Sequence, residues 1–325
     1  MLLEVLLSPL TLTSFVLLQL WAIATSKQQH ISITAIAPLF FRWLLHIQGI
    51  RPDIAAHHLI SNLPVLNPPA LVPALNSALC WGSVGPTLFA SNLTGYTPSF
   101  LTVPAAGKEN IGNMIHTRTL FFDKALAKNL TAVKQVVLLG AGFDTRLLKF
   151  CANQGLALFE IDQSETQQIK IETLQKSGVA LDDITFVSVD FNREDWAVKL
   201  LQAGFETDQP TFFLWEGVTY YLSETTVKAN LLKMANISGT GSAIAFDVFS
   251  SSFISASGEW IKIRPFVHLL SLFGEPFRFG MAQLDDMAIA HLLNAAGLQV
   301  QAMQRMGDHS GTAFGALVSA VKQAP

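Results

Sequence analysis

The chain has few charged residues and only two cysteines. Asp, Glu, Lys and Arg make up 14% of its 325 residues, whereas typical soluble proteins contain about 25%. Cys80 and Cys151 lie far apart in sequence and form neither a disulfide framework nor a zinc-binding pair, which fits a reducing compartment. The sequence has no HExxH motif, and its eight histidines lack the spacing of a ligand set. The sequence therefore predicts no metal site.

Basic residues are also too few and too scattered to form a nucleic-acid surface. The formal net charge is −3, whereas nucleic-acid-binding domains usually carry a basic patch or stripe. We therefore expect no nucleic-acid partner.

The shortage of charge is greatest near the N-terminus. Residues 1–25 contain a single charge, Glu4, and are long enough to cross a bilayer, which takes about 20 residues. No basic residue precedes the apolar run, as it would in a secretory signal. We expect a membrane anchor or membrane-lying helix, with a buried helix and a cleaved signal as alternatives. Lys27 follows the segment and favours a cytoplasmic orientation, so the protein is expected at the cytoplasmic face of a membrane or in the cytoplasm.

The most informative stretch that is present is residues 135–146, QVVLLGAGFDTR. An apolar strand followed by Gly140 and Gly142 is the pattern with which α/β proteins make room for a nucleoside cofactor. The dinucleotide fingerprint requires a third glycine where this chain has Thr145, and Asp144 precedes it. A carboxylate there would repel a pyrophosphate and suit a ligand with an amine or a sulfonium. The stretch therefore favours S-adenosylmethionine over NAD.

Acids follow three further apolar runs, at the positions where parallel strands would end. Glu160 and Asp162 lie 18 and 20 residues after Gly142, where an acid commonly holds a ribose diol. Asp190 with Phe191 ends the next run, and Glu216 ends the run after that. Because open α/β sheets bind ligands at the carboxyl ends of their strands, these residues are expected to surround one site.

These motifs resemble the leucine carboxyl methyltransferase-like branch of the class I S-adenosylmethionine-dependent methyltransferases, including its bacterial group. The resemblance covers roughly residues 30 to 325. It is carried by HTRTLFFD (116–123), VVLLGAGFDTR (136–146), FEIDQ (159–163), VSVDFNREDW (187–196), WEGVTYYLSE (215–224) and GEPFRFG (274–280).

The resemblance implies a role for each matching residue. Arg118 would pair with the methionine carboxylate of S-adenosylmethionine, and Glu216 would face its amino group. Asp162, with Glu160 as the alternative, would hold the ribose. The remaining cofactor residues would be Gly140, Gly142 and Asp144 around the methionine portion, and Asp190 with Phe191 at the adenine. No metal is implied.

Tyr220 and Tyr221 lie just after Glu216, where a methyl acceptor would approach. They are candidates to hydrogen-bond the acceptor or to line its pocket. A sulfonium methyl is already activated, so the enzyme mainly has to align the reactants and exclude water. A general base is needed only for an acceptor that arrives protonated.

The expected fold class is α/β. It comprises a Rossmann-like, mostly parallel seven-stranded sheet with an antiparallel closing hairpin, preceded by a helical cap. Residues 1–25 form the hydrophobic segment, 26–110 the cap and 111–325 the methyltransferase domain. Seven prolines between residues 62 and 107 predict short helices and loops there rather than a long helix.

The sequence thus predicts a methyltransferase that acts at an oxygen, carboxylate or hydroxyl, of a small or lipophilic acceptor. Two alternatives stay open. One is an NAD(P)-dependent oxidoreductase on a related sheet, and the other is a membrane-tethered protein that binds S-adenosylmethionine without turnover.

Overall fold

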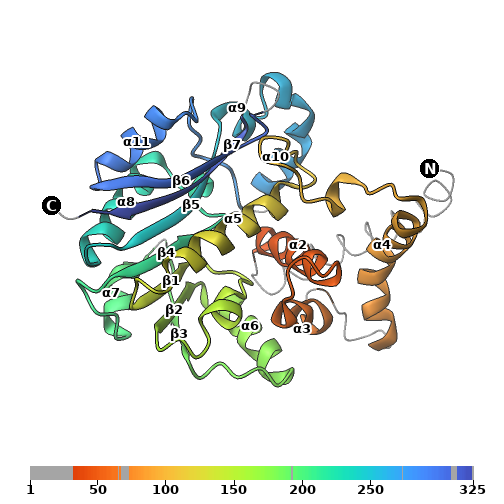
Figure 1. Cartoon of the computed structure of the whole chain (residues 1–325), viewed down its shortest axis with the longest axis horizontal. Coiled ribbons are helices and arrows are strands. Elements are labelled where there is room, and N and C mark those ends of the chain that lie inside the picture. The colour runs from red at the N-terminus through yellow and green to blue at the C-terminus, as the bar shows by residue number, and fades with distance from the viewer. Residues whose placement is uncertain are drawn as a thin grey trace. The chain divides into compact units, whose positions relative to one another are not determined.

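The computed structural model describes residues 32–64, 66, 73–191, 193–272, 274–308 and 313–323. The chain forms two compact units (Figure 1). The N-terminal unit comprises residues 1–103 together with Gly142–Thr145 and Ser164–Leu181, and the larger unit comprises the remainder.

The larger unit is built on a seven-stranded sheet in the order β3-β2-β1-β4-β5-β7-β6. The first five strands are parallel, and β7 runs antiparallel to both β5 and β6. This arrangement confirms the predicted sheet and its closing hairpin. The strands are β1 (Gln135–Leu139), β2 (Ala157–Asp162), β3 (Ile184–Ser188), β4 (Thr211–Trp215), β5 (Ala243–Phe249), β6 (Leu298–Met306) and β7 (Gly315–Lys322).

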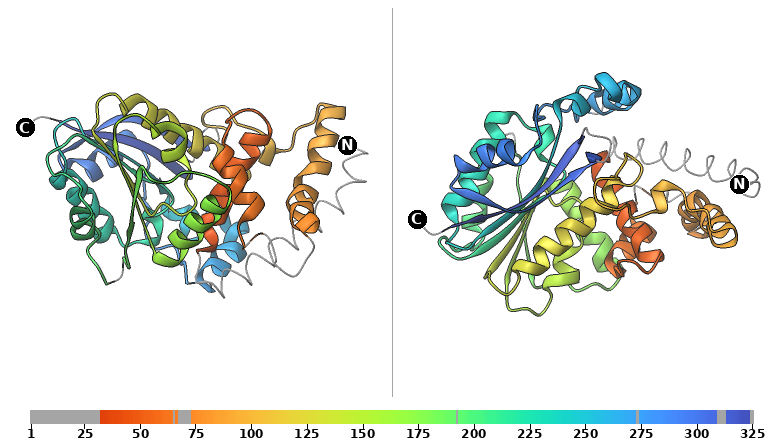
Figure 2. Two further views of the ribbon diagram at one scale, coloured as in Figure 1. Left: turned by 90° about the horizontal axis from the view of Figure 1, so that it is seen from below. Right: turned by 45° about the horizontal axis from the view of Figure 1, so that its top comes forward.

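Helices of the same unit cover both faces of this sheet. Helix α5 lies on one face, and α8 and α11 lie on the other (Figure 2, right). Side chains of Asp195, Ser223 and Asp285 cap the N-termini of α7, α8 and α11 by accepting from backbone N–H groups. The helices are α5 (Met114–Asn129), α7 (Trp196–Gln202), α8 (Glu224–Ile237), α9 (Ser251–Ile254), α10 (Arg264–Leu272) and α11 (Asp286–Asn294), with short helical turns η3 (Leu147–Cys151), η4 (Thr219–Tyr221) and η5 (Gly258–Ile263).

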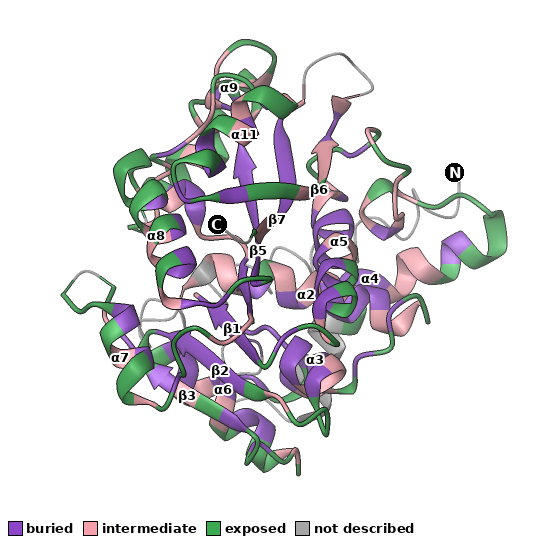
Figure 3. Cartoon of the chain, turned by 60° about the vertical axis from the view of Figure 1, so that its left-hand side comes forward, coloured by how far each residue is buried: buried purple, intermediate pink, exposed green. Residues whose placement is uncertain are grey.

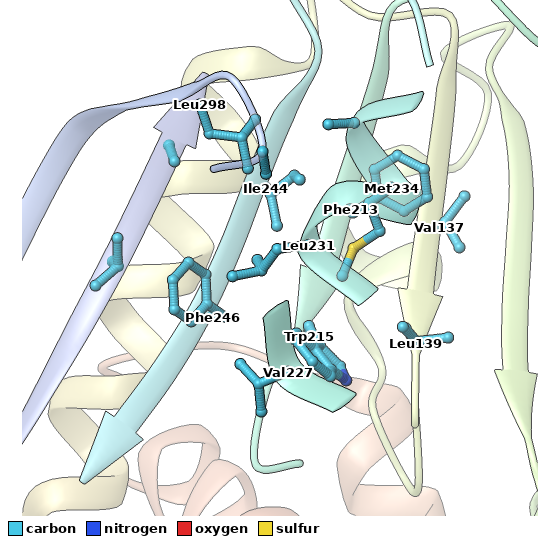
Figure 4. Packing of buried hydrophobic residues seen from close by; sticks show 14 of the residues in the cluster. Val137, Leu139, Phe213, Trp215, Val227, Leu231, Met234, Ile244, Phe246 and Leu298 are labelled. Carbon is cyan, nitrogen blue, oxygen red and sulfur yellow. The ribbon is translucent and has the colours of Figure 1, made fainter. Parts of the chain in front are cut away.

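The main hydrophobic core lies between the sheet and the helices α7, α8 and α11. Central strands such as β1 and β5 are buried along their whole length (Figure 3). Alternate strand residues face α8, whose own apolar residues complete the cluster (Figure 4). The labelled members are Val137, Leu139, Phe213, Trp215, Val227, Leu231, Met234, Ile244, Phe246 and Leu298.

The intervening strand residues point to the opposite face, because side chains alternate along a strand. Helix α5 packs on that face against β4, β5 and β7. Three acids of the strands share it, because Glu160 and Asp162 alternate with the core residues Phe159 and Ile161, and Asp247 lies between the core residues Phe246 and Val248. All three acids are buried. Burying a carboxylate costs free energy unless it is paired with a cation or hydrogen-bonded, so these three acids are candidates for ion pairs or for ligand binding.

The N-terminal unit is helical within its described residues. Its elements are η1 (Ile33–Ala35), α2 (Ile36–Ile47), α3 (Ile54–Asn62), α4 (Pro73–Thr94), η2 (Ser99–Leu101) and α6 (Ser164–Lys176). Helices α2 and α3 pack against each other, and α3 also contacts α6. The domain boundary near residue 110 stays a prediction.

The prediction of only short helices between residues 62 and 107 was wrong, because α4 runs for 22 residues. Pro73 is its first residue, a position that tolerates proline because the first N–H has no intrahelical partner. Pro86 lies inside the helix and removes one backbone hydrogen bond. The other prolines of the region lie outside α4, so proline number was a poor guide to helix length.

Within the described ranges, every helix is too short or too polar to traverse a bilayer. The predicted membrane segment, residues 1–25, lies outside these ranges.

Candidate cofactor site at the strand ends

The glycine turn after β1 depends on left-handed backbone conformations. Gly140 has φ +70° and Gly142 has φ +51°, values that side chains other than glycine rarely adopt. A Cβ on Gly140 would also lie 2.6 Å from Val218 Cγ2. The backbone N–H groups of Gly140 and Ala141 donate to Ile161 O, at 2.9 and 3.1 Å. The turn is therefore fastened to the end of β2, beside Asp162.

Both candidate ribose acids lie on β2. Glu160 is 1% exposed and Asp162 is 9% exposed. Asp162 Oδ1 accepts from the backbone N–H of Gln163 at 2.6 Å, which fixes the carboxylate at the carboxyl end of the strand. The larger exposure of Asp162 and its place at the strand end favour it over Glu160 as a ligand-binding acid.

The predicted adenine pair follows β3. Phe191 is 37% exposed, so a face of its ring can cover a ligand. The Asp190 carboxylate lies 3.5 Å from Arg193 Nε, with the Asp190 side chain 43% exposed. An exposed ion pair of this length is weak, so it presents little resistance to a competing ligand.

Arg118 points from α5 into the sheet end and is nearly buried, with 4% exposure. Its Nε donates to Glu216 Oε1 at 3.0 Å. Its Nη1 donates to Tyr220 OH and to Asp247 Oδ2, each at 3.2 Å. Its Nη2 has no hydrogen-bond partner among the residues that the structure describes. The guanidinium edge lies along Gly217, where an added Cβ would approach Nη1 and Nη2 within 3.7 and 3.8 Å.

Glu216 is shared by two arginines. Its Oε2 accepts from Arg146 Nη1 at 2.5 Å, while Oε1 accepts from Arg118. Arg146 is fully buried, and its Nε donates to Asp123 Oδ1 at 2.7 Å. Arg146 thus links Glu216 to Asp123, which lies on helix α5 with Arg118.

Sequence reasoning missed Asp247 and Arg146. Asp247 is fully buried in β5, where its Oδ1 accepts from the Gly217 N–H at 2.7 Å. A single acid within the apolar strand AIAFDVF was the signal that could have revealed it. Arg146 was visible in the motif, but its partners lie 23 and 70 residues away. We call Arg118, Asp123, Arg146, Glu216 and Asp247 the charged cluster.

Burial and charge shift the pKa values of three groups around Arg118. Burial alone would lower the pKa of Arg118, but neighbouring Tyr220, Glu216 and Asp247 raise it above its usual value. Burial raises the pKa of the Asp247 carboxyl, although Arg118 and the Gly217 N–H oppose this. Burial also raises the pKa of the Tyr220 phenol. Tyr220 therefore stays protonated at neutral pH and is a poor general base.

The two tyrosines belong to an aromatic group that includes residues from later in the chain. The rings of Tyr220 and Tyr221 lie 4.7 Å apart, and Phe277 lies 5.3 Å from the first and 5.6 Å from the second. Tyr220 is buried, whereas Tyr221 and Phe277 are partly exposed. Tyr220 thus faces Arg118 through its hydroxyl, and Tyr221 and Phe277 offer aromatic surface.

In the N-terminal unit, Gly142 and Asp144 lie against the cap helices. A Cβ on Gly142 would lie 3.1 Å from Ala35 Cβ. Asp144 is buried, and its Oδ2 accepts from Arg42 Nη2 at 2.8 Å. The negative charge of Asp144, which was expected to suit a cationic ligand, is balanced by Arg42. Its role as a cofactor residue stays a prediction.

Comparison with known proteins identifies the family. The leucine carboxyl methyltransferase family profile matches residues 97–235. A Frankia alni protein named "Putative S-adenosyl-L-methionine-dependent methyltransferase" is 31% identical over 248 residues, covering 71% of this chain and 83% of that protein. The chain belongs to the leucine carboxyl methyltransferase-like family. This confirms the resemblance found in the sequence motifs.

Other members of the leucine carboxyl methyltransferase-like family match over shorter segments. A Mycobacterium avium protein of the same name is 34% identical over 149 residues, which cover 45% of this chain and 47% of that protein. The chain thus spans about half the length of the mycobacterial relatives that it matches. The structure of the mitomycin 7-O-methyltransferase is 15% identical, covers 75% of this chain and 63% of that one, and gives a TM-score of 0.43.

The observed residues fit the cofactor of this family. With every acid ionised, the charged cluster has two positive and three negative groups, or one net negative charge. S-adenosylmethionine carries a sulfonium, an ammonium and a carboxylate, or one net positive charge. Arg118 and Glu216 place a cation next to an anion, which is the pair of charges that a zwitterionic methionine tail requires. Further acids at the strand ends would oppose the phosphates of NAD.

Proposed function

We propose that this protein is an S-adenosylmethionine-dependent methyltransferase that methylates an oxygen, carboxylate or hydroxyl, of a small or lipophilic acceptor. The observation that carries the proposal is the paired arrangement of Arg118 and Glu216 beside the glycine turn. A zwitterionic methionine tail requires one cation and one anion at such a place. S-adenosylmethionine supplies a methyl group that its sulfonium has already activated.

Each residue of the site then has a binding role. Arg118 holds the carboxylate through Nη2, and Glu216 accepts from the ammonium. Asp162 accepts from the ribose hydroxyls, with Glu160 behind it on the same strand face. Asp190 and Phe191 recognise the adenine by a hydrogen bond and by ring contact. These groups fix the cofactor's orientation, and in-line transfer depends on that orientation.

The acceptor side of the proposal rests on the aromatic group. Tyr221 and Phe277 are partly exposed and provide a surface for an apolar acceptor. Tyr220 stays protonated and bonded to Arg118, so it positions groups rather than removing protons. A carboxylate acceptor would need no base, which suits a site whose nearest phenol holds its proton.

Incubation with methyl-labelled S-adenosylmethionine and a metabolite and lipid extract tests the proposal. We expect label in an extract product that is released by mild alkaline hydrolysis if it is a carboxyl ester. Binding of S-adenosylhomocysteine with no transfer to any fraction would support the binding protein without turnover. Binding of NADH and no binding of S-adenosylhomocysteine would refute the proposal.

The ribose assignment predicts that Asp162→Ala weakens S-adenosylhomocysteine binding by about 1–3 kcal/mol, because hydroxyl groups would lose a buried partner. Isothermal titration measures this, with Glu160→Gln in parallel to test the neighbouring acid. Asp183→Ala is the control, because Asp183 is an exposed acid just before β3. If Asp162→Ala and Glu160→Gln both bind as tightly as the wild type, neither acid holds the ribose.

Membrane association through residues 1–25 is a second part of the proposal, and it rests on the sequence alone. We expect the full-length chain to sediment with membranes and to resist a salt wash, because apolar burial contributes about 25 cal/mol per Å². A chain that starts near Lys27 should be recovered in the supernatant and still bind S-adenosylhomocysteine. Full-length protein that stays in a high-speed supernatant without detergent would contradict this expectation.

A further inference from the structure

Three consecutive buried side chains follow the glycine turn. Asp144, Thr145 and Arg146 are 5%, 1% and 0% exposed. They occupy the region where a dinucleotide-binding turn would place its third glycine. Three polar side chains can be buried in succession only if each has a specific partner.

Asp144 is held by helix α2. Arg42 of that helix donates from Nη2 to Asp144 Oδ2 at 2.8 Å, and from Nη1 to the Phe143 carbonyl oxygen at 3.4 Å. One buried arginine thus binds both a side chain and the backbone of the segment. Arg42 precedes Phe143 by 101 residues and Asp144 by 102 residues, so both are long-range contacts.

Thr145 is held by the N-terminus of helix α3. Its hydroxyl donates to Asp53 Oδ2 at 2.6 Å. The other oxygen of Asp53 caps α3 by accepting from the Ala56 N–H at 3.0 Å, and Arg51 pairs with Oδ2. The Asp53 carboxylate is therefore fixed by helix α3 before it meets Thr145.

The chain passes between the two compact units on either side of this segment. Gly142–Thr145 groups with the N-terminal unit, whereas Ala141 and Arg146 group with the unit that carries the sheet. Arg146 is fixed independently by Asp123 and Glu216. The shape of the glycine turn, with its two left-handed glycines, is thus restrained at its far end by residues of α2 and α3.

We propose that Arg42 and Asp53 are positioning residues that hold the glycine turn in its cofactor-binding shape through Asp144 and Thr145. This inference rests on the proposed function. Coupling of this kind is reciprocal. If the contacts of α2 and α3 with the turn strengthen cofactor binding, then cofactor binding must strengthen those contacts by the same free energy. Cofactor binding should therefore reduce opening of α2 and α3.

The test uses two substitutions of one residue in the full chain. Thr145→Val keeps the shape of threonine and removes the hydroxyl that donates to Asp53, whereas Thr145→Ser keeps the hydroxyl. We expect Thr145→Val to weaken S-adenosylhomocysteine binding roughly tenfold, because the turn loses the hydrogen bond to a carboxylate that holds it in its binding shape. Thr145→Ser should stay within about twofold of the wild type. Isothermal titration gives both dissociation constants.

Hydrogen exchange of the wild type provides a second readout that does not depend on how the variants fold. Bound S-adenosylhomocysteine should slow exchange in α3, Ile54–Asn62, more than in α11, Asp286–Asn294. Equal binding by both Thr145 variants, or a Thr145→Val protein that loses thermal stability but binds normally, would overturn the inference. So would unchanged exchange in α3. A wild type that does not bind S-adenosylhomocysteine at all would instead refute the proposed function.

Discussion

Replacing Arg146 by methionine should lower the free energy of unfolding by about 3–5 kcal/mol, the usual cost of removing one partner from a buried ion pair. Arg146 is fully buried and bonds Asp123, Glu216 and the Thr119 carbonyl oxygen. Methionine can fill most of the space, but it removes the cation that pairs with Asp123 and one of the two arginines that share Glu216. Urea denaturation of the variant and the wild type measures the loss.

A surface arginine provides the control for this substitution. Arg193→Met removes a cation whose side chain is 85% exposed and whose ion pair is 3.5 Å long, so stability should change by less than about 1 kcal/mol. The double variant Arg146→Met with Asp123→Asn should lose less than the sum of the single losses, because Asn no longer buries an unpaired charge. An Arg146→Met protein as stable as Arg193→Met would mean that the cluster reorganises around the missing arginine.

The sheet could be predicted from the sequence because its strands are short apolar runs that end at polar residues. The apolar strand expected before Gly140 is β1, and the apolar run expected to end at Glu216 is β4, which ends at Trp215. Each is buried along its length, so the apolar run and the strand coincide. The expected antiparallel closing hairpin is formed by β6 and β7.

The region between β5 and α11 was not predicted, because its helical elements are only four to nine residues long. Helix α10 is only nine residues long, and most of its apolar side chains face solvent, including Phe266 and Leu272. Its apolar residues do recur on one side of the helix, but the helix is short and most of that side is exposed. Helix α4 was not predicted for another reason. The many prolines of the region indicated short helices, but a long helix tolerates one internal proline, Pro86.

The sequence predicted the residues of the site that lie at strand ends, but not the contacts between them. Glu160, Asp162 and Glu216 lie at or near the ends of β2 and β4, as expected. Their partners could not be read from the sequence, because Arg118 meets Glu216 across 98 residues and Asp247 across 129. The same limit explains Asp144, whose ion pair with Arg42 depends on how the chain returns to the cap helices. Motifs identify the residue types, and long-range packing decides which of them meet.

Substitution of Arg118 should cause the largest loss of cofactor affinity. Arg118→Ala removes the donor proposed for the methionine carboxylate and also leaves Glu216 and Asp247 short of one cation. We expect about 100-fold weaker binding of S-adenosylhomocysteine, which corresponds to roughly 2.7 kcal/mol. Arg118→Lys should also bind poorly, because one ammonium cannot bond Glu216, Tyr220 and Asp247 and still offer a donor at the position of Nη2.

A ligand without the carboxylate separates direct recognition from general damage to the cluster. Wild-type protein should prefer S-adenosylmethionine over its decarboxylated analogue, because only the former has the carboxylate that Arg118 binds. Arg118→Ala should lose that preference, because the guanidinium that distinguishes the two ligands is gone. Tyr220→Phe removes one hydrogen bond to Arg118 but keeps the guanidinium, so it should retain most of the preference. Titration of both ligands into all three proteins gives the coupling between Arg118 and the carboxylate. If Arg118→Ala discriminates between the two ligands as strongly as the wild type does, another residue holds the carboxylate and Arg118 only supports Glu216.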